Sequence, residues 1–199
     1  MTHAMPDRPT GVPRAFGQRG GGVFQATVAD RARLAQALGQ HFSLVWRSLR
    51  RFGVEEHAVD DAAQHVFLTF AERLPDVAAE QERAFLMGLC VRVAANARRK
   101  RTRSPETASD ELEQHAIQAP DPEQLLQSKQ QRAALDRALD ALPIDQRSVF
   151  VLFELEGFSL PEIAELLQLP LGTATSRLRR ARHRFEKWVS ALQHSGEAP

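Results

Sequence analysis

The sequence contains no tyrosine and a single cysteine, Cys90, among 199 residues. One cysteine cannot form an internal disulfide, and its place in an apolar helical run indicates a buried thiol rather than a redox switch. No run of about 18 apolar residues is present, and the start lacks a secretory signal pattern. We therefore expect a soluble cytoplasmic protein without a stable membrane insertion.

Motifs of the common catalytic and metal sites are also missing. The chain has no GxSxG, Walker loop, HExxH or paired-cysteine pattern, and its Gly20-Gly21-Gly22 run lacks a strand and helix around it. His57, Asp61 and His65 recur at every fourth position and could share one helix face, but one face rarely completes a tetrahedral metal site. We expect neither an enzyme nor a bound metal or cofactor.

The net charge is only +1, yet the charges are unevenly distributed. Residues 92–103 hold six basic side chains and no acidic one, whereas residues 104–131 hold six acidic side chains and one lysine. These blocks cancel in the total but lie in different parts of the chain. Because the distribution of charge matters more than its sum, the small net charge does not exclude nucleic acid as a partner.

The apolar residues recur with a helical period, and the alternation typical of strands is absent. We predict an all-α fold of two small helical bundles joined by a flexible acidic linker, the C-terminal bundle being a helix-turn-helix domain. The predicted parts are a disordered arm (1–28), the first bundle (29–103), the linker (104–122), the second bundle (123–192) and a disordered tail (193–199). Within the first bundle, helical patterns run over about 29–51, 59–74 and 80–103, and the buried face of the first is assigned to Leu38, Phe42, Val45, Trp46, Leu49 and Phe52.

The stretch from Leu139 to Phe185 is typical of a helix, a turn and a second helix. Ser159 and Glu162 form a capping-box pattern at the start of the first helix, and Pro170 suits the start of the second. The second helix carries an apolar stripe of Ala174, Leu178, Ala181 and Phe185. Its opposite side presents Gly172, Thr173, Ser176, Arg179, Arg180 and His183, a set suited to a DNA major groove.

Arginines opposite an apolar stripe are most often a solvated helix face, so that reading stands beside DNA binding. The charge here is one-sided, however, because this stretch holds a single acidic residue, Glu186. The basic residues are Arg177, Arg179, Arg180, Arg182, Arg184 and Lys187. A helix built only for solubility usually mixes signs.

This segment resembles the promoter-reading C-terminal domain of the extracytoplasmic-function (ECF) sigma factors. The matching residues are Leu139, Leu142, Pro143, Arg147, Phe150, Leu155, Glu156, Gly157, Ser159, Glu162, Ile163, Ala164, Gly172, Thr173, Ser176, Arg177, Leu178, Arg180, Ala181 and Arg182. Gln168 stands where the family usually has glycine in the turn, and Thr175 where a basic residue is common. The resemblance implies DNA contacts from Gly172, Thr173, Thr175, Ser176, Arg177, Arg179, Arg180 and His183 at the minus-thirty-five promoter element.

The segment 60–70 is similar to the ECF segment that docks on core RNA polymerase. Asp61, Gln64, Val66 and Phe67 match, whereas Ala62 and His65 depart from the family pattern. A buried stripe of Ala63, Val66, Phe67 and Phe70 would leave Asp60, Asp61, Gln64 and His65 available to the polymerase. The two aspartates also suit a helix N-terminus through its dipole, which is compatible with docking.

The third helix of the first bundle pairs an apolar stripe with a basic end. Its stripe is Phe85, Leu86, Leu89, Cys90, Val93 and Ala94. It resembles the ECF helix at the minus-ten element, which implies DNA contacts from Arg92, Asn96, Arg98, Arg99, Lys100 and Arg101. The family usually has tryptophan, asparagine and aspartate where Phe85, Arg92 and Asn96 stand. Cations also favour a helix C-terminus, but five basic residues in the six positions 98–103 exceed that need.

The resemblance covers about 29–192 and implies a sigma factor with core RNA polymerase and both double-stranded and melted promoter DNA as partners. It further implies an anti-sigma factor that can hold the protein inactive, although the sequence names none. The alternative is a stand-alone helix-turn-helix regulator that does not bind core polymerase.

Overall fold

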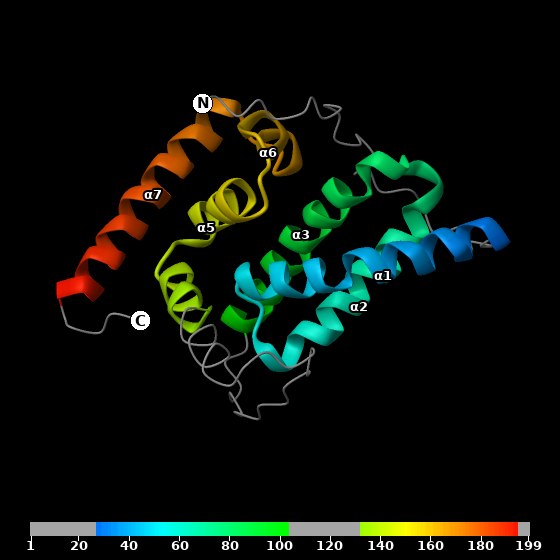
Figure 1. Ribbon diagram of the computed structural model, residues 1–199, viewed down its shortest axis with the longest axis horizontal. Helices are drawn as coiled ribbons and strands as arrows, with labels where there is room; N and C mark the ends of the chain where they lie inside the picture. Colours follow the sequence, from blue (N-terminus) through cyan, green and yellow to red (C-terminus); the bar gives the residue numbers. More distant parts are fainter. Residues whose placement is uncertain (1–26, 104–131, 195–199) are drawn as a thin grey trace, which may run out of the picture.

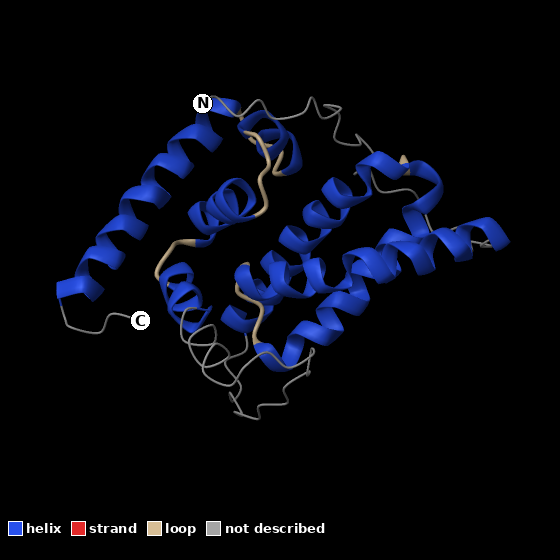
Figure 2. Ribbon diagram, viewed as in Figure 1, coloured by secondary structure: helices blue, strands red, loops and turns tan. Residues whose placement is uncertain are grey.

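A computed structural model describes residues 27–103 and 132–194, and within these ranges it contains helices and loops but no strand (Figure 2). The all-α fold class is confirmed. The elements are α1 (Val28–Arg51), α2 (Glu56–Arg73), the 3-10 turns η1 (Leu74–Asp76) and η2 (Ala79–Gln81), α3 (Glu82–Arg103), a helix over 132–140, α5 (Ile144–Phe150), the π-helical η3 (Val151–Leu155), α6 (Leu160–Leu166) and α7 (Leu171–His194). None of the described helices is long and apolar enough to cross a membrane.

Helices α1, α2 and α3 pack on one another in pairs and form the N-terminal helical group. A capping box starts α1, in which the Thr27 side chain and amide are bonded to Asp30. Phe52, Phe70 and Phe85 are almost completely buried at the centre of the group. The rings of Phe70 and Phe85 lie 6.2 Å apart between centroids. The predicted apolar stripes of α2 and α3 are confirmed as the surfaces that close this core.

The predicted buried face of α1 is wrong at two positions. Leu38 is 36% exposed and Phe42 45% exposed, whereas Ala37, Val45 and Ser48 are buried. The Phe42 ring stacks on Phe67 with ring centroids 6.2 Å apart and an angle of 16° between the planes, and the side chain still keeps its exposure. The helical period identifies the apolar side of α1, but α2 and α3 cover a strip rotated away from Leu38 and Phe42.

The helix over 132–140 and helices α5, α6 and α7 form the C-terminal helical group (Figure 1). Helix α7 lies along α5 and also contacts α6. The rings of Phe150 on α5 and Phe185 on α7 are 4.8 Å apart between centroids. Leu139, Leu152 and Ile163 are fully buried and close the core of this group.

The two helical groups are packed against each other, with α3 beside the C-terminal group and α7 on the outer edge (Figure 1). Their buried residues form one continuous hydrophobic cluster. The sequence predicts the two groups but not this contact. The predicted linker (104–122), most of the arm, residues 123–131 and the end of the tail (195–199) lie outside the described residues.

Candidate nucleic-acid interface

The predicted capping box fixes the start of α6, the first helix of the helix-turn-helix. The Ser159 amide donates to Glu162 Oε2 at 2.7 Å, and the Glu162 amide donates to Ser159 Oγ at 3.5 Å. Both local donors at this helix start therefore have a partner, as the sequence pattern indicates. The box holds the direction in which α6 leaves the preceding turn.

The turn between α6 and α7 contains a left-handed residue, Gln168, with φ of 54°. The Gln168 amide donates to Glu165 O at 3.2 Å, and the Leu169 amide to Ala164 O at 2.8 Å. These bonds satisfy carbonyls at the end of α6. Gln168 therefore adopts the left-handed conformation at the position where the sequence pattern discussed above usually has glycine.

Helix α7 has the two faces that its sequence predicts. Ala174, Leu178 and Ala181 are buried against the C-terminal group, and Phe185 is partly buried. On the other side Gly172, Thr175, Arg179, Arg180 and His183 are exposed, while Thr173, Ser176 and Arg177 are half-buried. The packing of α7 on α5 and α6 therefore presents a row of small polar and basic side chains to the surroundings.

Hydrogen bonds within α7 organise the exposed row. The Ser176 hydroxyl donates to Thr173 O at 3.0 Å. Arg180 donates through Nε to Ser176 O at 3.2 Å and through Nη2 to Ser176 Oγ at 3.4 Å. The Arg180 side chain therefore lies along the helix with its guanidinium exposed. It is close to Ser176, so the two can act on the same part of a ligand.

Two arginines of α7 pair with acidic residues from other elements. Arg177 lies 3.3 Å from Asp145 on α5, and Arg182 lies 2.6 Å from Glu154 on η3. The guanidinium of Arg182 also sits 5.0 Å from the centre of the Phe153 ring. The sequence of α7 itself contains Glu186 as its one acidic residue, so it suggests a more positive surface than the fold produces once Asp145 and Glu154 lie beside the helix. Arg179, Arg180, Arg184 and Lys187 are further exposed cations of this helix.

An open depression of about 490 Å³ lies at the N-terminal end of α7, lined by Leu171, Gly172, Thr175, Ser176 and Arg179. Leu171 is 50% exposed and was not singled out by the sequence. The first amides of a helix carry a partial positive charge, and Arg179 adds a full one. The depression therefore suits a phosphate or a base edge placed at the start of the helix.

The predicted polymerase-docking residues share the exposed face of α2. Asp60, Asp61, Gln64 and His65 are all exposed, while the predicted stripe of Ala63, Val66, Phe67 and Phe70 is buried. The Trp46 indole donates to Asp60 Oδ1 at 2.9 Å, so Asp60 also ties α2 to α1. Leu68 follows on the same face with 58% exposure and adds an apolar residue that the sequence comparison missed.

The predicted minus-ten residues of α3 do not form one uniform surface. Asn96 and Arg99 are exposed, and Arg99 Nη2 donates to Asn96 Oδ1 at 2.8 Å. Arg92 is half-buried, and its burial lowers the pKa of its guanidinium. Arg98 is half-buried near Gly53. The side chains of Lys100 and Arg101 lie outside the described part of the chain.

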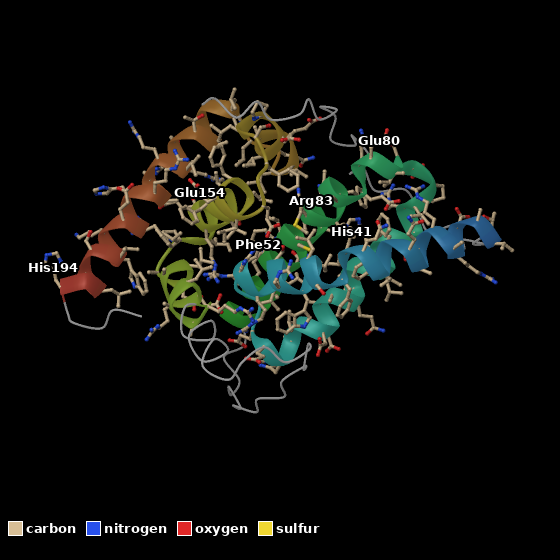
Figure 3. The ribbon with its side chains drawn as sticks, in the orientation of Figure 1. His41, Phe52, Glu80, Arg83, Glu154 and His194 are labelled. Atoms are coloured by element: carbon tan, nitrogen blue, oxygen red, sulfur yellow. The ribbon has the colours of Figure 1, made fainter. Side chains whose placement is uncertain are left out.

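The turn between α2 and α3 carries the acidic residues Asp76 and Glu80 and is held by Arg33 of α1. The sequence did not indicate this role of Arg33. Arg33 donates to Glu82 Oε1 at 2.6 Å, to Leu74 O at 3.1 Å and to Val77 O. Glu82 is therefore a buried anchor rather than a surface acid. Glu80 lies at the outer end of the turn, away from the C-terminal group (Figure 3).

The described residues contain no group of three or more His, Cys, Asp and Glu side chains that could hold a metal ion. Cys90 is fully buried, as its sequence context predicts. This burial raises the pKa of its thiol well above the usual range.

Comparison with known proteins gives one family match and several relatives. The model for Sigma-70, region 4 matches residues 132–185. The chain is 28% identical over 195 residues to the ECF RNA polymerase sigma factor SigE of Mycolicibacterium smegmatis, a match that covers 96% of this chain and 71% of the relative. It is 39% identical over 71 residues to the ECF RNA polymerase sigma-E factor of Escherichia coli K12, covering 36% of this chain and 37% of that protein.

Two solved structures share the fold. CnrH in complex with the cytosolic domain of CnrY aligns with a TM-score of 0.57 and 23% identity, covering 82% of this chain and 98% of that one. The sigma factor RpoE of Bartonella quintana, in complex with the anti-sigma factor NepR, aligns with a TM-score of 0.61 and 21% identity, covering 78% and 96%.

Proposed function

We propose that this chain, which belongs to the ECF group of RNA polymerase sigma factors, binds core RNA polymerase and directs it to specific promoters by reading their DNA. One observation carries the proposal. Helix α7 buries Ala174, Leu178 and Ala181 and presents Arg179 and Arg180 outward, directly after a capped helix and a short turn. This geometry lets the start of α7 enter the major groove.

In the major groove, the exposed row of α7 meets the minus-thirty-five element. An arginine can donate two parallel hydrogen bonds to a guanine, and small side chains such as Gly172 and Thr175 allow close approach. The depression at the start of α7 receives a phosphate or base edge. Arg177 supports α7 through Asp145 and contacts DNA from the side.

The N-terminal group acts at the polymerase and the minus-ten element. The exposed face of α2, with Asp61, Gln64 and Leu68, docks on core RNA polymerase. Arg92, Arg98 and Arg99 on α3 contact phosphates of the duplex and of the melted strand. Two modest DNA contacts held on one polymerase reinforce each other through effective concentration.

An anti-sigma factor is a further proposed partner, since related folds are found in such a complex. The chain acts in the cytoplasm, where the polymerase works, and it acts by binding rather than by catalysis. The polymerase would supply all of the chemistry of initiation.

The test is transcription in vitro with core polymerase on a pool of genomic fragments. The chain should select a subset of fragments that share two spaced elements. The double variant Asp61→Ala/Gln64→Ala should bind core polymerase at least about tenfold more weakly, because removing hot-spot side chains costs about 1–2 kcal/mol each. Its fold should persist, since both side chains are exposed.

The matched control is Gln36→Ala/Gln40→Ala, a pair on α1 that is also exposed and that should keep the parent affinity. Unchanged polymerase binding by the Asp61/Gln64 variant would refute the docking face. A chain that binds promoter DNA but never polymerase would instead be a stand-alone regulator.

A further inference from the structure

A buried carboxylate joins the two helical groups. Glu156 lies in the turn between η3 and α6, and its side chain is 4% exposed. It accepts hydrogen bonds from Arg51 Nη1 at 3.0 Å, Arg83 Nη2 at 3.3 Å and Ser48 Oγ at 3.3 Å. All three donors belong to α1 or α3, so the Glu156 carboxylate bonds across the boundary between the groups.

Arg83 strengthens the same contact through two further interactions. It donates to the backbone carbonyl of Glu156 at 2.6 Å, and its guanidinium lies 4.6 Å over the Phe158 ring. Arg83 projects from α3 toward the C-terminal group (Figure 3). A cation over an aromatic ring and a buried carboxylate together specify one relative position of α3 and the turn.

A second set of hydrogen bonds crosses the boundary in the opposite direction. Arg147 of α5 is 3% exposed and pairs with Asp140 of its own group at 2.6 Å. It also donates across the boundary to Arg51 O and to Arg50 O, the latter at 3.3 Å. These carbonyls belong to the last turn of α1, where cations are favoured. Gly53 follows with φ of 92°, and a Cβ there would lie 3.2 Å from Arg147 Nη1. The missing side chain leaves room for the guanidinium.

Such contacts favour two arrangements of the helical groups, closed or separated, over any intermediate arrangement. A buried ion pair adds little net stability compared with apolar packing, but leaving one partner buried alone is costly. The groups are therefore either together with every charge paired, or apart with every charge hydrated. Intermediate arrangements would leave Glu156 desolvated without its arginine partners, and Arg147 paired with Asp140 but without the carbonyls of α1.

The closed arrangement does not fit the proposed function on a promoter. Elements centred about 25 base pairs apart are separated by roughly 85 Å, at about 3.4 Å per pair. A compact body of about 140 residues has a radius of gyration of roughly 14 Å and is about 40 Å across. The joining residues, 104–131, could span about 90 Å when extended. Simultaneous contact with both elements therefore requires the two groups to separate.

We propose that Glu156 and Arg147 form an interdomain latch that holds the free protein closed and releases when polymerase and promoter bind the two groups apart. That the latch opens rests on the proposed function, whereas the latch itself rests on the described contacts. Arg98, a proposed phosphate contact, lies against the same boundary, near Gly53, in the closed arrangement. Ligands that bind only separated groups shift the population toward the open state.

The latch can be tested by distances between two spin labels. Ser43 on α1 and Ser190 on α7 are exposed, so Ser43→Cys and Ser190→Cys provide labelling sites at small cost. The native Cys90 is fully buried and remains unlabelled in the folded protein. The free parent should give one narrow distribution at the distance set by the closed arrangement. A broad distribution in the free parent would overturn the proposal.

The latch variant is Glu156→Gln, which removes the charge and keeps the shape. It should raise the ratio of open to closed molecules at least about tenfold, because Arg51 and Arg83 lose their anionic partner. The control is Glu154→Gln, two residues earlier, whose ion pair with Arg182 lies within the C-terminal group. A narrow, short distribution in Glu156→Gln would overturn the latch. If that variant does not fold, Arg83→Gln probes the same contact from α3 with the same two outcomes.

A measurement with core polymerase and a duplex that carries both promoter elements distinguishes a failure of the latch from a failure of the proposed function. The labelled parent should bind and shift to long distances. A bound, transcribing parent that keeps the short distance would overturn the opening. A parent that binds neither polymerase nor promoter would refute the proposed function, while the distances in the free protein still decide whether Glu156 holds the groups together.

Discussion

Replacing Gln168 by glycine should stabilise the C-terminal group. Gln168 has φ of 54° in the turn between α6 and α7, a region that is unfavourable for residues with a Cβ. Its side chain is exposed. Glycine adopts this conformation without strain, and the backbone bonds of Gln168 and Leu169 to α6 can stay in place.

The magnitude follows from two opposing terms. Relief of the left-handed strain contributes about 1–2 kcal/mol. The greater freedom of glycine in the unfolded chain costs roughly 0.5–1 kcal/mol. The difference is a gain of about 0.5–1 kcal/mol in the free energy of unfolding, which raises Tm by roughly 1–4 °C for a chain of this size.

Urea denaturation measures this gain. Trp46 and Trp188 are the two tryptophans of the chain, so in a Trp46→Phe background the fluorescence of Trp188 reports on α7. Gln168→Ala is the control, because alanine keeps the Cβ and should give no comparable gain. The reasoning fails if glycine lowers the unfolding midpoint or if alanine stabilises as much as glycine.

Two further predictions concern the helix-turn-helix. Arg180→Ala should weaken promoter binding by about 1–3 kcal/mol and relax base preference at a few adjacent positions. Arg184→Ala should instead weaken binding to all sequences uniformly and reduce the salt dependence of binding. Binding to a library of promoter variants at several salt concentrations distinguishes the two variants, and parent-like selectivity in Arg180→Ala would contradict this role. Ser159→Ala should lower the free energy of unfolding by about 1 kcal/mol through loss of the α6 cap, and an unchanged urea midpoint would show that Glu162 alone satisfies this helix start.

Features set by neighbours in the sequence were predictable. The capping box joins Ser159 to Glu162, three residues apart, and the burial of Ala174, Leu178 and Ala181 follows the helical period. The glutamine at position 168 left the turn geometry open, and the structure shows it in the left-handed conformation. The polymerase-docking and promoter contacts stay predictions, although the exposure of Asp61 and Gln64 is confirmed.

Local pattern was insufficient where burial or charge depended on a distant segment. Leu38 and Phe42 continue the apolar side of α1, yet the position of α2 and α3 leaves them exposed. Arg182 looks unopposed in its own helix, but Glu154, 28 residues earlier, neutralises it.

The main helical segments, the cap of α6 and the apolar faces of α2, α3 and α7 depend on interactions between residues a few positions apart, so the sequence predicts them. The role of Glu156 depends on the packing of the two groups, because its partners Ser48 and Arg51 lie 108 and 105 positions away. Hydrogen bonding and desolvation act over a few ångströms in space, so a carboxylate acquires arginine partners only when the packed helices bring them into contact.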